Sequence, residues 1–293
     1  MFSIRIGLNL LIVMFLMSCS ASYKELKKLE IEQSNNFQHY LLMEYKVKAT
    51  FEAEEMHDWN SAKLYSEKAL KSLVTDQIYP EEISYWKLPE SEINEINIAH
   101  ESFKSIYEKA KIADPYNLAR AIVSLDCWSE QQEENWQSWD INKCKNDYFN
   151  SMHILYEKIK NIEDANTKSV SKNNATVITK NKDDKILQII YFDFDKTKLS
   201  KVSINKIKNF VKNHNSNINS YIIVGHTDTK GTKKYNLNLS LERADVVKNL
   251  LLENGIHSSK IKILGKGETS PAIITPDDTK HPLNRRVEIK KTN

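Results

Sequence analysis

The spacing of apolar residues changes once along this 293-residue chain. From residue 23 to about residue 160, apolar residues recur every three or four positions, which is typical of helices packed on one face. After residue 186, short apolar runs alternate with longer amphipathic segments, as in a sheet covered by helices. Residues 161–185 are rich in Asn, Lys, Ser, Thr and Asp and carry no apolar stripe. The sequence therefore predicts two folded units, 19–160 and 186–293, joined by a linker.

The distribution of charge follows the same division. Residues 188–293 carry 19 Lys/Arg and 10 Asp/Glu, whereas residues 19–187 carry 22 and 29. This asymmetry suggests that the two units have different partners. The net charge of the whole chain, +3, is too small to indicate nucleic acid as a partner. Gly and Pro number only six each, which excludes collagen and Gly/Pro-rich disorder.

The first 18 residues have the features of an export signal. Arg5 precedes an apolar run over residues 8–17, which is short for a bilayer span but fits a signal-peptide core. The run ends in Leu16-Met17-Ser18-Cys19, which resembles a bacterial lipobox. The resemblance implies that residues 1–18 are removed and that Cys19 is lipidated, with acyl chains such as palmitate. An ordinary signal peptide and a buried N-terminal helix are the alternatives.

Lipidation would fix the location of the chain. Each buried methylene of an acyl chain contributes about 0.8 kcal/mol, so several chains on one Cys form a stable anchor. Ser20 follows the lipobox. By resemblance to lipoprotein sorting in Gram-negative bacteria, a residue other than Asp at this position implies the outer membrane. We therefore expect a lipid-anchored protein that faces the periplasm.

The two remaining cysteines, Cys127 and Cys144, are candidates for a disulfide. Export implies an oxidising compartment, where a disulfide persists. Their separation of 17 residues would join one helix to the next. Two unpaired buried thiols are the alternative. A metal site is less favoured, because the chain has no CxxC and no His pair beside these residues at ligand spacing. No metal and no other cofactor is expected.

Five helices are expected in the acidic unit. The first runs from Tyr23 to about His57, and Asp58 or Asn60 can cap the second. The other three are expected over about 91–112, from Asp114-Pro115 onward, and over roughly 141–160. Residues 44–73 loosely resemble a tetratricopeptide helical hairpin, although no clean 34-residue repeat is present.

The basic C-terminal unit alternates strands and helices. Strands are expected over 189–194, 221–225, 261–264 and 287–289, and helices over 200–213 and 239–253. Gly231 and Asn236 are expected in the loop before the second helix. In chain order the elements read βαβαββ, so that each helix can cover one face of a single mixed sheet. The fold class predicted for the whole chain is α+β, with an all-α unit in front of the sheet.

Several motifs of this unit share a known order and spacing. They are Phe192-Asp-Phe-Asp195, Gly225-His-Thr-Asp-Thr-Lys-Gly231, Tyr235-Asn236, Leu239-Ser-Leu-Glu-Arg-Ala244 and Asn284-Arg-Arg-Val-Glu288. Together they resemble the OmpA-like peptidoglycan-binding domain over residues 188–293. With the lipobox in front, the whole chain resembles the peptidoglycan-associated type of outer-membrane lipoprotein. The helical unit is not part of the short version of that type.

The resemblance implies a ligand that carries both charges on one side chain. The meso-diaminopimelate of Gram-negative peptidoglycan ends in an ammonium and a carboxylate. Asp228 matches the residue that holds the ammonium, and Arg243 matches the residue that holds the carboxylate. Arg suits this role because its guanidinium donates two parallel hydrogen bonds to a carboxylate. An internal salt bridge between Asp228 and Arg243 is the alternative.

Further residues are expected around the same ligand. Those that match pocket-lining positions of the family are Phe194, Asp195 and Leu239. Asn236 is expected to order the loop, and Arg286 either lines the site or pairs with an acid near the core. No catalytic residue is expected, because the sequence offers no nucleophile–base or zinc constellation.

These observations predict a non-catalytic tether between the outer membrane and peptidoglycan. The lipid anchor would hold the membrane, and the C-terminal unit would bind the diaminopimelate of the stem peptide. The alternative is an envelope adaptor, in which the helical unit binds a partner protein and the C-terminal unit only localises it. A wall hydrolase is a third hypothesis.

Overall fold

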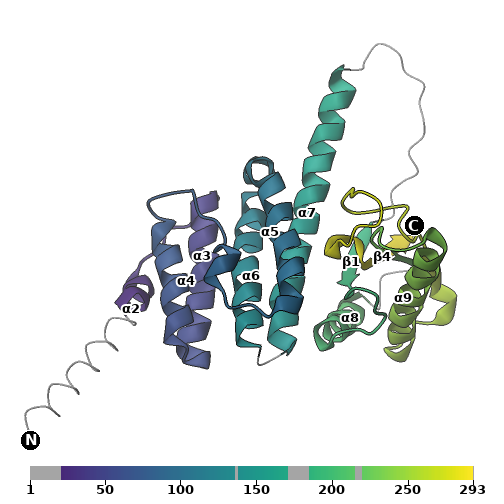
Figure 1. Cartoon of the computed structure of the whole chain (residues 1–293), viewed down its shortest axis with the longest axis horizontal. Helices are drawn as coiled ribbons and strands as arrows, with labels where there is room; N and C mark the ends of the chain where they lie inside the picture. The colour runs from purple at the N-terminus through teal and green to yellow at the C-terminus, as the bar shows by residue number, and fades with distance from the viewer. Residues whose placement is uncertain (1–20, 136–137, 171–184, 215–219, 293) are drawn as a thin grey trace, which may run out of the picture.

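A computed structural model describes residues 21–135, 138–170, 185–214 and 220–292. The predicted signal peptide, the predicted lipidation site Cys19 and residues 171–184 of the predicted linker lie outside this range. Within it, no helix is both long and apolar enough to cross a membrane. A row of helices is followed by a small sheet with its own helices, so the predicted α+β class is confirmed (Figure 1).

Six α-helices form the N-terminal part of the described chain, which we call the helical part. They are α2 (Ala21–Lys28), α3 (Phe37–Phe51), α4 (Trp59–Lys71), α5 (Glu90–Ala113), α6 (Pro115–Glu134) and α7 (Ser138–Val170), with a π-helical turn η1 (Glu52–Met56) and a 3-10 turn η2 (Ile83–Tyr85). The long first helix that we predicted is divided, because Asn36 starts α3 by accepting a hydrogen bond from the His39 amide at 2.8 Å. Asp58 caps α4 and Asp114 caps α6, as expected.

Helix α7 is longer than the sequence predicted. We expected it to end near residue 160, where the composition becomes polar, but it continues to Val170. Polar residues suit a helix that is surrounded by solvent, so composition alone could not locate its end. An ion pair between Lys109 of α5 and Glu163 of α7, 2.7 Å long, ties part of this extension to the neighbouring helix. The predicted linker therefore begins at least ten residues too early.

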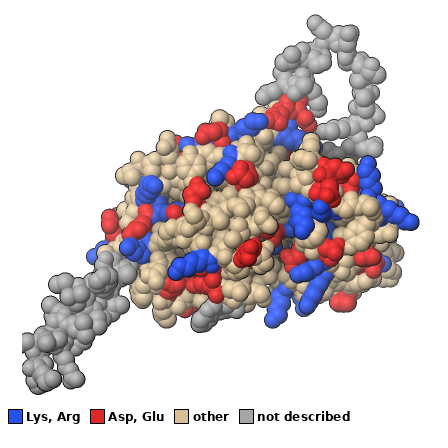
Figure 2. All heavy atoms as spheres, viewed as in Figure 1, with Lys and Arg blue, Asp and Glu red and all other residues tan. Residues whose placement is uncertain are grey.

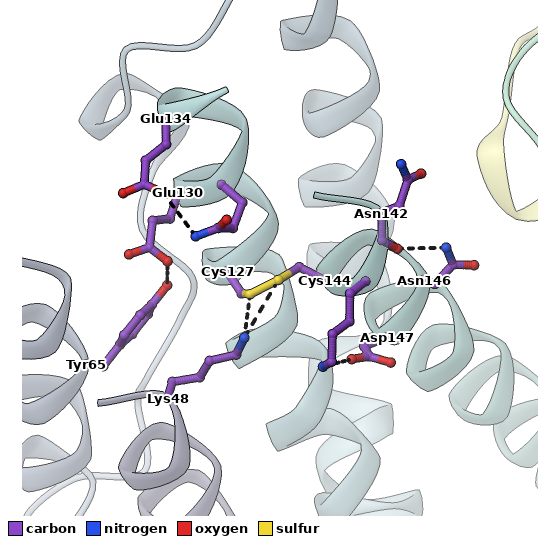
Figure 3. The surroundings of a disulfide bond; sticks show 11 residues. Lys48, Tyr65, Cys127, Glu130, Glu134, Asn142, Cys144, Asn146 and Asp147 are labelled. Carbon is purple, nitrogen blue, oxygen red and sulfur yellow. Dashed lines mark hydrogen bonds and ion pairs between the residues drawn. A yellow bond between two sulfur atoms is a disulfide. The ribbon is translucent and has the colours of Figure 1, made fainter. Parts of the chain in front are cut away.

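The predicted disulfide joins α6 to α7. Cys127 and Cys144 are bonded, and their Cα atoms are 5.6 Å apart. Figure 3 shows the amino group of Lys48, from α3, directed at this bond, with its Nζ 2.7 Å from Cys127 Sγ and 3.7 Å from Cys144 Sγ. In the same view the Tyr65 hydroxyl of α4 donates a hydrogen bond to the buried Glu130 carboxylate of α6. Polar contacts thus connect four helices around the disulfide.

The C-terminal part, which we call the sheet part, has four strands and two α-helices. They are β1 (Ile186–Tyr191), α8 (Lys201–His214), β2 (Ser220–Gly225), α9 (Lys233–Glu253), β3 (Ile261–Gly265) and β4 (Arg286–Thr292), with 3-10 turns η3 (Ser258–Lys260) and η4 (Pro282–Asn284). The strand order is β1-β4-β2-β3, in which β2 and β3 are parallel and the other pairs are antiparallel. The sheet is mixed, as the sequence predicted.

Helix α9 begins six residues earlier than expected. Thr232 caps it by accepting a hydrogen bond from the Tyr235 amide at 3.2 Å. Asn236 therefore lies in the first turns of the helix and not in the preceding loop, which corrects our prediction. The polar run Lys233-Lys234 concealed this start, because it contributes nothing to an apolar stripe.

The two parts pack against each other along α7 and β1. Successive residues of a strand point to opposite faces. Accordingly Ile190 lies in the core of the sheet part, whereas Ile189 and Tyr191 belong to the core of the helical part. The Tyr191 hydroxyl donates to the Phe149 carbonyl of α7 at 3.1 Å, and the two rings lie 5.1 Å apart. The sheet is therefore covered in part by the helices that precede it in the sequence.

Charged side chains of both signs share the surface of both parts. On the face in Figure 2, Lys and Arg side chains and Asp and Glu side chains are interspersed, with uncharged surface between them. The opposite net charges of the two parts thus do not produce two faces of single sign in this view.

Candidate ligand-binding pocket

Strand β2 and helix α9 contact each other closely, and this contact positions the residues of the predicted site. A Cβ atom added to Gly225, at the end of β2, would lie 1.9 Å from the carbonyl oxygen of Ser240 in α9. Only glycine allows the strand and the helix to approach this closely. Arg243 follows Ser240 by one turn, and Asp228 follows Gly225 by three residues. The two predicted ligand residues are brought together by this contact.

Both residues line one pocket of about 240 Å³. Its lining residues are Phe194, Asp195, Asp228, Lys230, Gly231, Tyr235, Asn236, Leu239, Arg243 and Asp278. Six of the seven residues that the sequence predicted for the ligand are among them, and Arg286 is not. These six residues come from three separate segments, namely the chain after β1, the loop after β2 and the first half of α9, and Asp278 adds a fourth segment, the loop between β3 and β4.

The carboxylate of Asp228 is held on one side only. Its Oδ2 atom accepts hydrogen bonds from the His281 amide at 3.1 Å and from Arg285 Nη1 at 3.3 Å. Its Oδ1 atom accepts no hydrogen bond from the residues that the structure describes. Because an ionised carboxylate can accept about four hydrogen bonds, Asp228 retains capacity for a donor in the pocket.

The guanidinium of Arg243 is fixed by backbone carbonyls. Its three nitrogens donate to Lys196 O at 2.9 Å, Asp193 O at 3.1 Å and His226 O at 3.3 Å. A guanidinium has five N–H donors, so two remain for a ligand. Burial, followed by the nearby Arg285 cation, lowers the pKa of Arg243 to about 10, and the group stays cationic at neutral pH.

Asp228 and Arg243 do not form an ion pair with each other. The ion pair of Asp228 is with Arg285, and none of the carboxylates in the described ranges lies within 4.0 Å of the Arg243 nitrogens. The alternative that we considered, an internal salt bridge between these two residues, is therefore not what the structure contains. A carboxylate and a guanidinium with unused hydrogen-bonding capacity share one pocket, which is an arrangement that suits a zwitterionic ligand.

The rim of the pocket is ordered by contacts among its own residues. The Tyr235 hydroxyl donates to Asp195 at 2.5 Å, and the Lys230 amino group pairs with Asp278 at 2.6 Å. Asn236 donates to the Asp228 carbonyl at 3.3 Å and so ties the loop to α9, as expected. The ring of Phe194 remains 38% exposed, which leaves an apolar surface at the entrance.

Arg286 lies away from this pocket. Its guanidinium pairs with Glu288, with Nε and Nη2 2.8 Å and 2.5 Å from Oε1. Of the two roles that we considered for Arg286, pairing with an acid near the core is the one observed. The neighbouring Arg285 reaches the pocket residue Asp228 instead. Adjacent residues of an extended chain point to opposite sides. The sequence alone did not indicate which of the two successive Arg residues points toward the pocket.

Several contributors were missing from the predicted set. Tyr235, Lys230 and Asp278 line the pocket, and His281 and Arg285 hold Asp228. Tyr235 belongs to a motif that we recognised, so its position was a usable signal. Among the described residues, no group of three or more His, Cys, Asp or Glu side chains could hold a metal ion.

Comparisons with known proteins find relatives of the sheet part, the C-terminal domain of the chain. Residues 191–285 match the OmpA family. The peptidoglycan-associated lipoprotein of Pseudomonas putida is 30% identical over 101 residues, which cover 34% of this chain and 61% of that protein. Outer membrane porin F of Pseudomonas aeruginosa is 38% identical over 103 residues, which cover 34% of this chain and 29% of the porin. The matches thus span less than two thirds of either relative.

A solved structure is also similar to part of the chain. The crystal structure of the peptidoglycan-associated lipoprotein from Burkholderia pseudomallei is 26% identical, with a TM-score of 0.33. The similarity covers 36% of this chain and 91% of that one.

Proposed function

We propose that this chain, whose C-terminal domain is an OmpA family domain, binds peptidoglycan and connects it to the outer membrane. Relatives of that domain bear the name peptidoglycan-associated lipoprotein, which supports an envelope protein that binds the wall. In this proposal residues 1–18 are a signal peptide, and acyl chains on Cys19 hold the membrane. The protein acts by binding and carries out no reaction.

The ligand proposed for the pocket is the meso-diaminopimelate of the stem peptide. One observation carries this proposal: Asp228 and Arg243 line the same pocket, and each keeps hydrogen-bonding capacity that the other does not use. The ammonium of diaminopimelate would donate to Asp228, and its carboxylate would accept from the two remaining N–H groups of Arg243. Hydrogen bonds to charged groups contribute about 1.5–3 kcal/mol each, so a single site would bind moderately. Many copies anchored on one membrane would add avidity.

Co-sedimentation with purified sacculi tests the proposal. The chain from residue 20 onward should sediment with sacculi that contain diaminopimelate, and Asp228→Ala or Arg243→Ala should prevent this. Asp245→Asn, two residues beyond Arg243 at a side chain that is 46% exposed, is the matched control and should sediment like the wild type. Sacculi with lysine in place of diaminopimelate lack the side-chain carboxylate and should bind weakly. Unchanged sedimentation of both Ala variants would exclude the proposed site.

A role as an adaptor for another envelope protein is the second candidate. The helical part leaves large apolar side chains exposed at Val74 and Ile112, whose exposed fractions are 83% and 87%. The ion pair between Asp76 and Lys111, 2.6 Å long, joins the two segments that carry these residues, and neighbouring exposed apolar side chains are compatible with a protein partner. Cross-linking in whole cells through a photoreactive residue at position 74 or 112 would capture such a partner. If only this chain itself is recovered, the adaptor role is not supported.

A further inference from the structure

Two residues donate hydrogen bonds to the carboxylate of the pocket residue Asp228, and side chains of helix α5 contact both of them. Arg285 donates from Nη1 to Asp228 Oδ2 at 3.3 Å, and its Nη2 lies 2.5 Å from Glu95 Oε1 of α5. His281 donates from its backbone amide to the same Oδ2 at 3.1 Å, and its Nε2 lies 3.1 Å from Ser102 Oγ of α5. Helix α5 is thus connected to the Asp228 carboxylate twice, once through Arg285 and once through His281.

The spacing and burial of these groups indicate a built contact. Glu95 and Ser102 are seven residues apart, which places them two turns apart on one face of the helix. Arg285 and His281 are 3% and 6% exposed, so both routes run through the interface between the two parts. A surface contact between mobile side chains would not have this burial.

Glu95 is also held in its ionised form. Its Oε2 atom accepts from Lys145 Nζ of α7 at 2.7 Å. Burial alone would raise the pKa of Glu95, but Lys145 and Arg285 outweigh burial, and the pKa is lowered. An ionised carboxylate, shared between Lys145 and Arg285, therefore lies against the outer nitrogen of Arg285.

We propose that Glu95 and Ser102 are positioning residues of the ligand pocket, and that helix α5 controls how much negative charge Asp228 offers to a cationic ligand. This inference rests on the proposed role of Asp228 as the acceptor of an ammonium group. It assigns the helical part a role inside the binding site itself.

The reasoning is electrostatic. A guanidinium that paired only with Asp228 would neutralise the carboxylate that the ligand must use. Because Glu95 also pairs with Arg285, it offsets part of the positive charge of the guanidinium. Arg285 therefore neutralises less of the negative charge on Asp228. The effect of each charge is enlarged by burial, because screening inside a protein is weaker than in water. Ser102 acts on the second hydrogen bond by holding the ring of His281, whose amide fixes the Oδ2 atom.

Selectivity for the ligand ammonium separates this role from a merely structural one. A defect in folding or docking would weaken all ligands together. Loss of charge at Asp228 would weaken only ligands that carry the cation. The informative quantity is therefore the ratio of two affinities, for a diaminopimelate-containing muropeptide with a free side-chain amine and for the same muropeptide with that amine acetylated.

Isothermal titration calorimetry with the chain from residue 20 onward measures this ratio. In Glu95→Gln we expect the preference for the free amine to fall about tenfold, the weakening expected when a hydrogen bond to a charged group is impaired. Glu95→Asp should restore part of the preference, and Ser102→Ala should reduce it by a smaller factor. Glu101→Gln is the matched control, because Glu101 lies on the same helix with its side chain 77% exposed.

The outcomes distinguish this inference from the function on which it rests. If Asp228→Asn leaves the amine preference unchanged, both the pocket assignment and the positioning role are excluded. If the preference depends on Asp228 but is unaltered in Glu95→Gln, only the positioning role is excluded. An equal loss of affinity for both muropeptides in Glu95→Gln also excludes it. Should Glu95→Gln fail to fold, Ser102→Ala provides the same comparison.

Discussion

Asp228 and Arg243 lie in one pocket without an ion pair between them, because other groups hold each of them in place. Backbone carbonyls fix the guanidinium, and Arg285 together with the His281 amide fixes the carboxylate. Buried charges are costly unless they are compensated, so an arrangement that keeps two of them apart must be stabilised by its surroundings. Here the surroundings include the helical part of the chain, through Glu95.

The geometry of Arg243 predicts that lysine cannot replace it. In Arg243→Lys the positive charge is retained, but one amino group cannot donate to three carbonyls and to a ligand carboxylate at once. We expect the affinity for a diaminopimelate-containing muropeptide to fall about tenfold, which corresponds to 1.4 kcal/mol. Calorimetric titration of the chain from residue 20 onward measures the change. Arg120→Lys, in α6 of the helical part, is the matched control and should bind like the wild type. Equal affinities for Arg243→Lys and the wild type would show that the forked geometry is unimportant.

Most of the local elements, and the presence of Asp228 and Arg243 in one pocket, could be predicted from the sequence. The number and approximate positions of the strands follow from the apolar runs, although β1 lies three residues nearer the N-terminus than the predicted 189–194. The placement of Asp228 and Arg243 in one pocket follows from a recognised motif order. The end of α7 and the start of α9 could not be predicted in this way. Both lie in polar stretches, such as Lys233-Lys234, where no apolar stripe distinguishes a solvated helix from a loop.

Contacts between distant parts of the chain were also beyond prediction. Glu95 reaches Arg285 across 190 residues, and nothing in the sequence near either residue indicates the other. The choice between Arg285 and Arg286 depended on the face that each presents at the start of β4. A shift of one residue reverses that face, so the identity of the contacting Arg required the three-dimensional structure.

A buried carboxylate in the helical part predicts a large loss of stability on substitution. Asp126 accepts hydrogen bonds from Tyr45, Lys68 and the Glu81 amide, each 2.6 Å long. In Asp126→Asn the Lys68 cation loses its fully buried partner and keeps only its ion pair with Glu81, whose side chain is 29% exposed. Removing one member of a buried pair costs up to about 3–5 kcal/mol, and the remaining Glu81 places the expected loss at the lower end, about 3 kcal/mol. Urea unfolding should show this decrease. Glu67→Gln, in an exposed pair with Lys63, should change the free energy of unfolding by less than about 1 kcal/mol. Similar values for the two variants would contradict the prediction.

The disulfide predicts a second stability effect that is separate from ligand binding. The Cys127–Cys144 bond closes a loop of 17 residues between α6 and α7. Chain-entropy arguments give about 3 kcal/mol for a loop of this length. The double variant Cys127→Ala, Cys144→Ala should lose about that much stability in urea under oxidising conditions. Addition of a reductant should lower the stability of the wild type but leave the double variant unchanged. An effect of the reductant on the double variant would show that it acts elsewhere.

Glu52 predicts how the stability of the helical part depends on pH. Burial first, and then the neighbouring Glu130 carboxylate, raises the pKa of Glu52 from 4.5 to about 8. The folded chain therefore keeps a proton that the unfolded chain releases above pH 4.5. Its stabilising contribution is complete below pH 4.5 and is lost as the pH rises toward 8.

Glutamine at position 52 imitates the protonated carboxyl at every pH. Glu52→Gln should therefore match the wild type near pH 4.5 and exceed its free energy of unfolding near pH 8. The pKa difference corresponds to about 4 kcal/mol at that pH, and partial screening by solvent reduces the expected difference to about 3 kcal/mol. Urea unfolding followed by tryptophan fluorescence at the two pH values measures the difference, and the buried Trp128 reports on this part. Glu55→Gln, at an exposed position of the same turn, should not alter the pH dependence. Glu130, whose pKa is raised to about 7, remains in the Glu52→Gln variant, so the slope should shrink without vanishing. Parallel pH profiles for the wild type and Glu52→Gln would mean that Glu52 is ionised in the folded chain across this range.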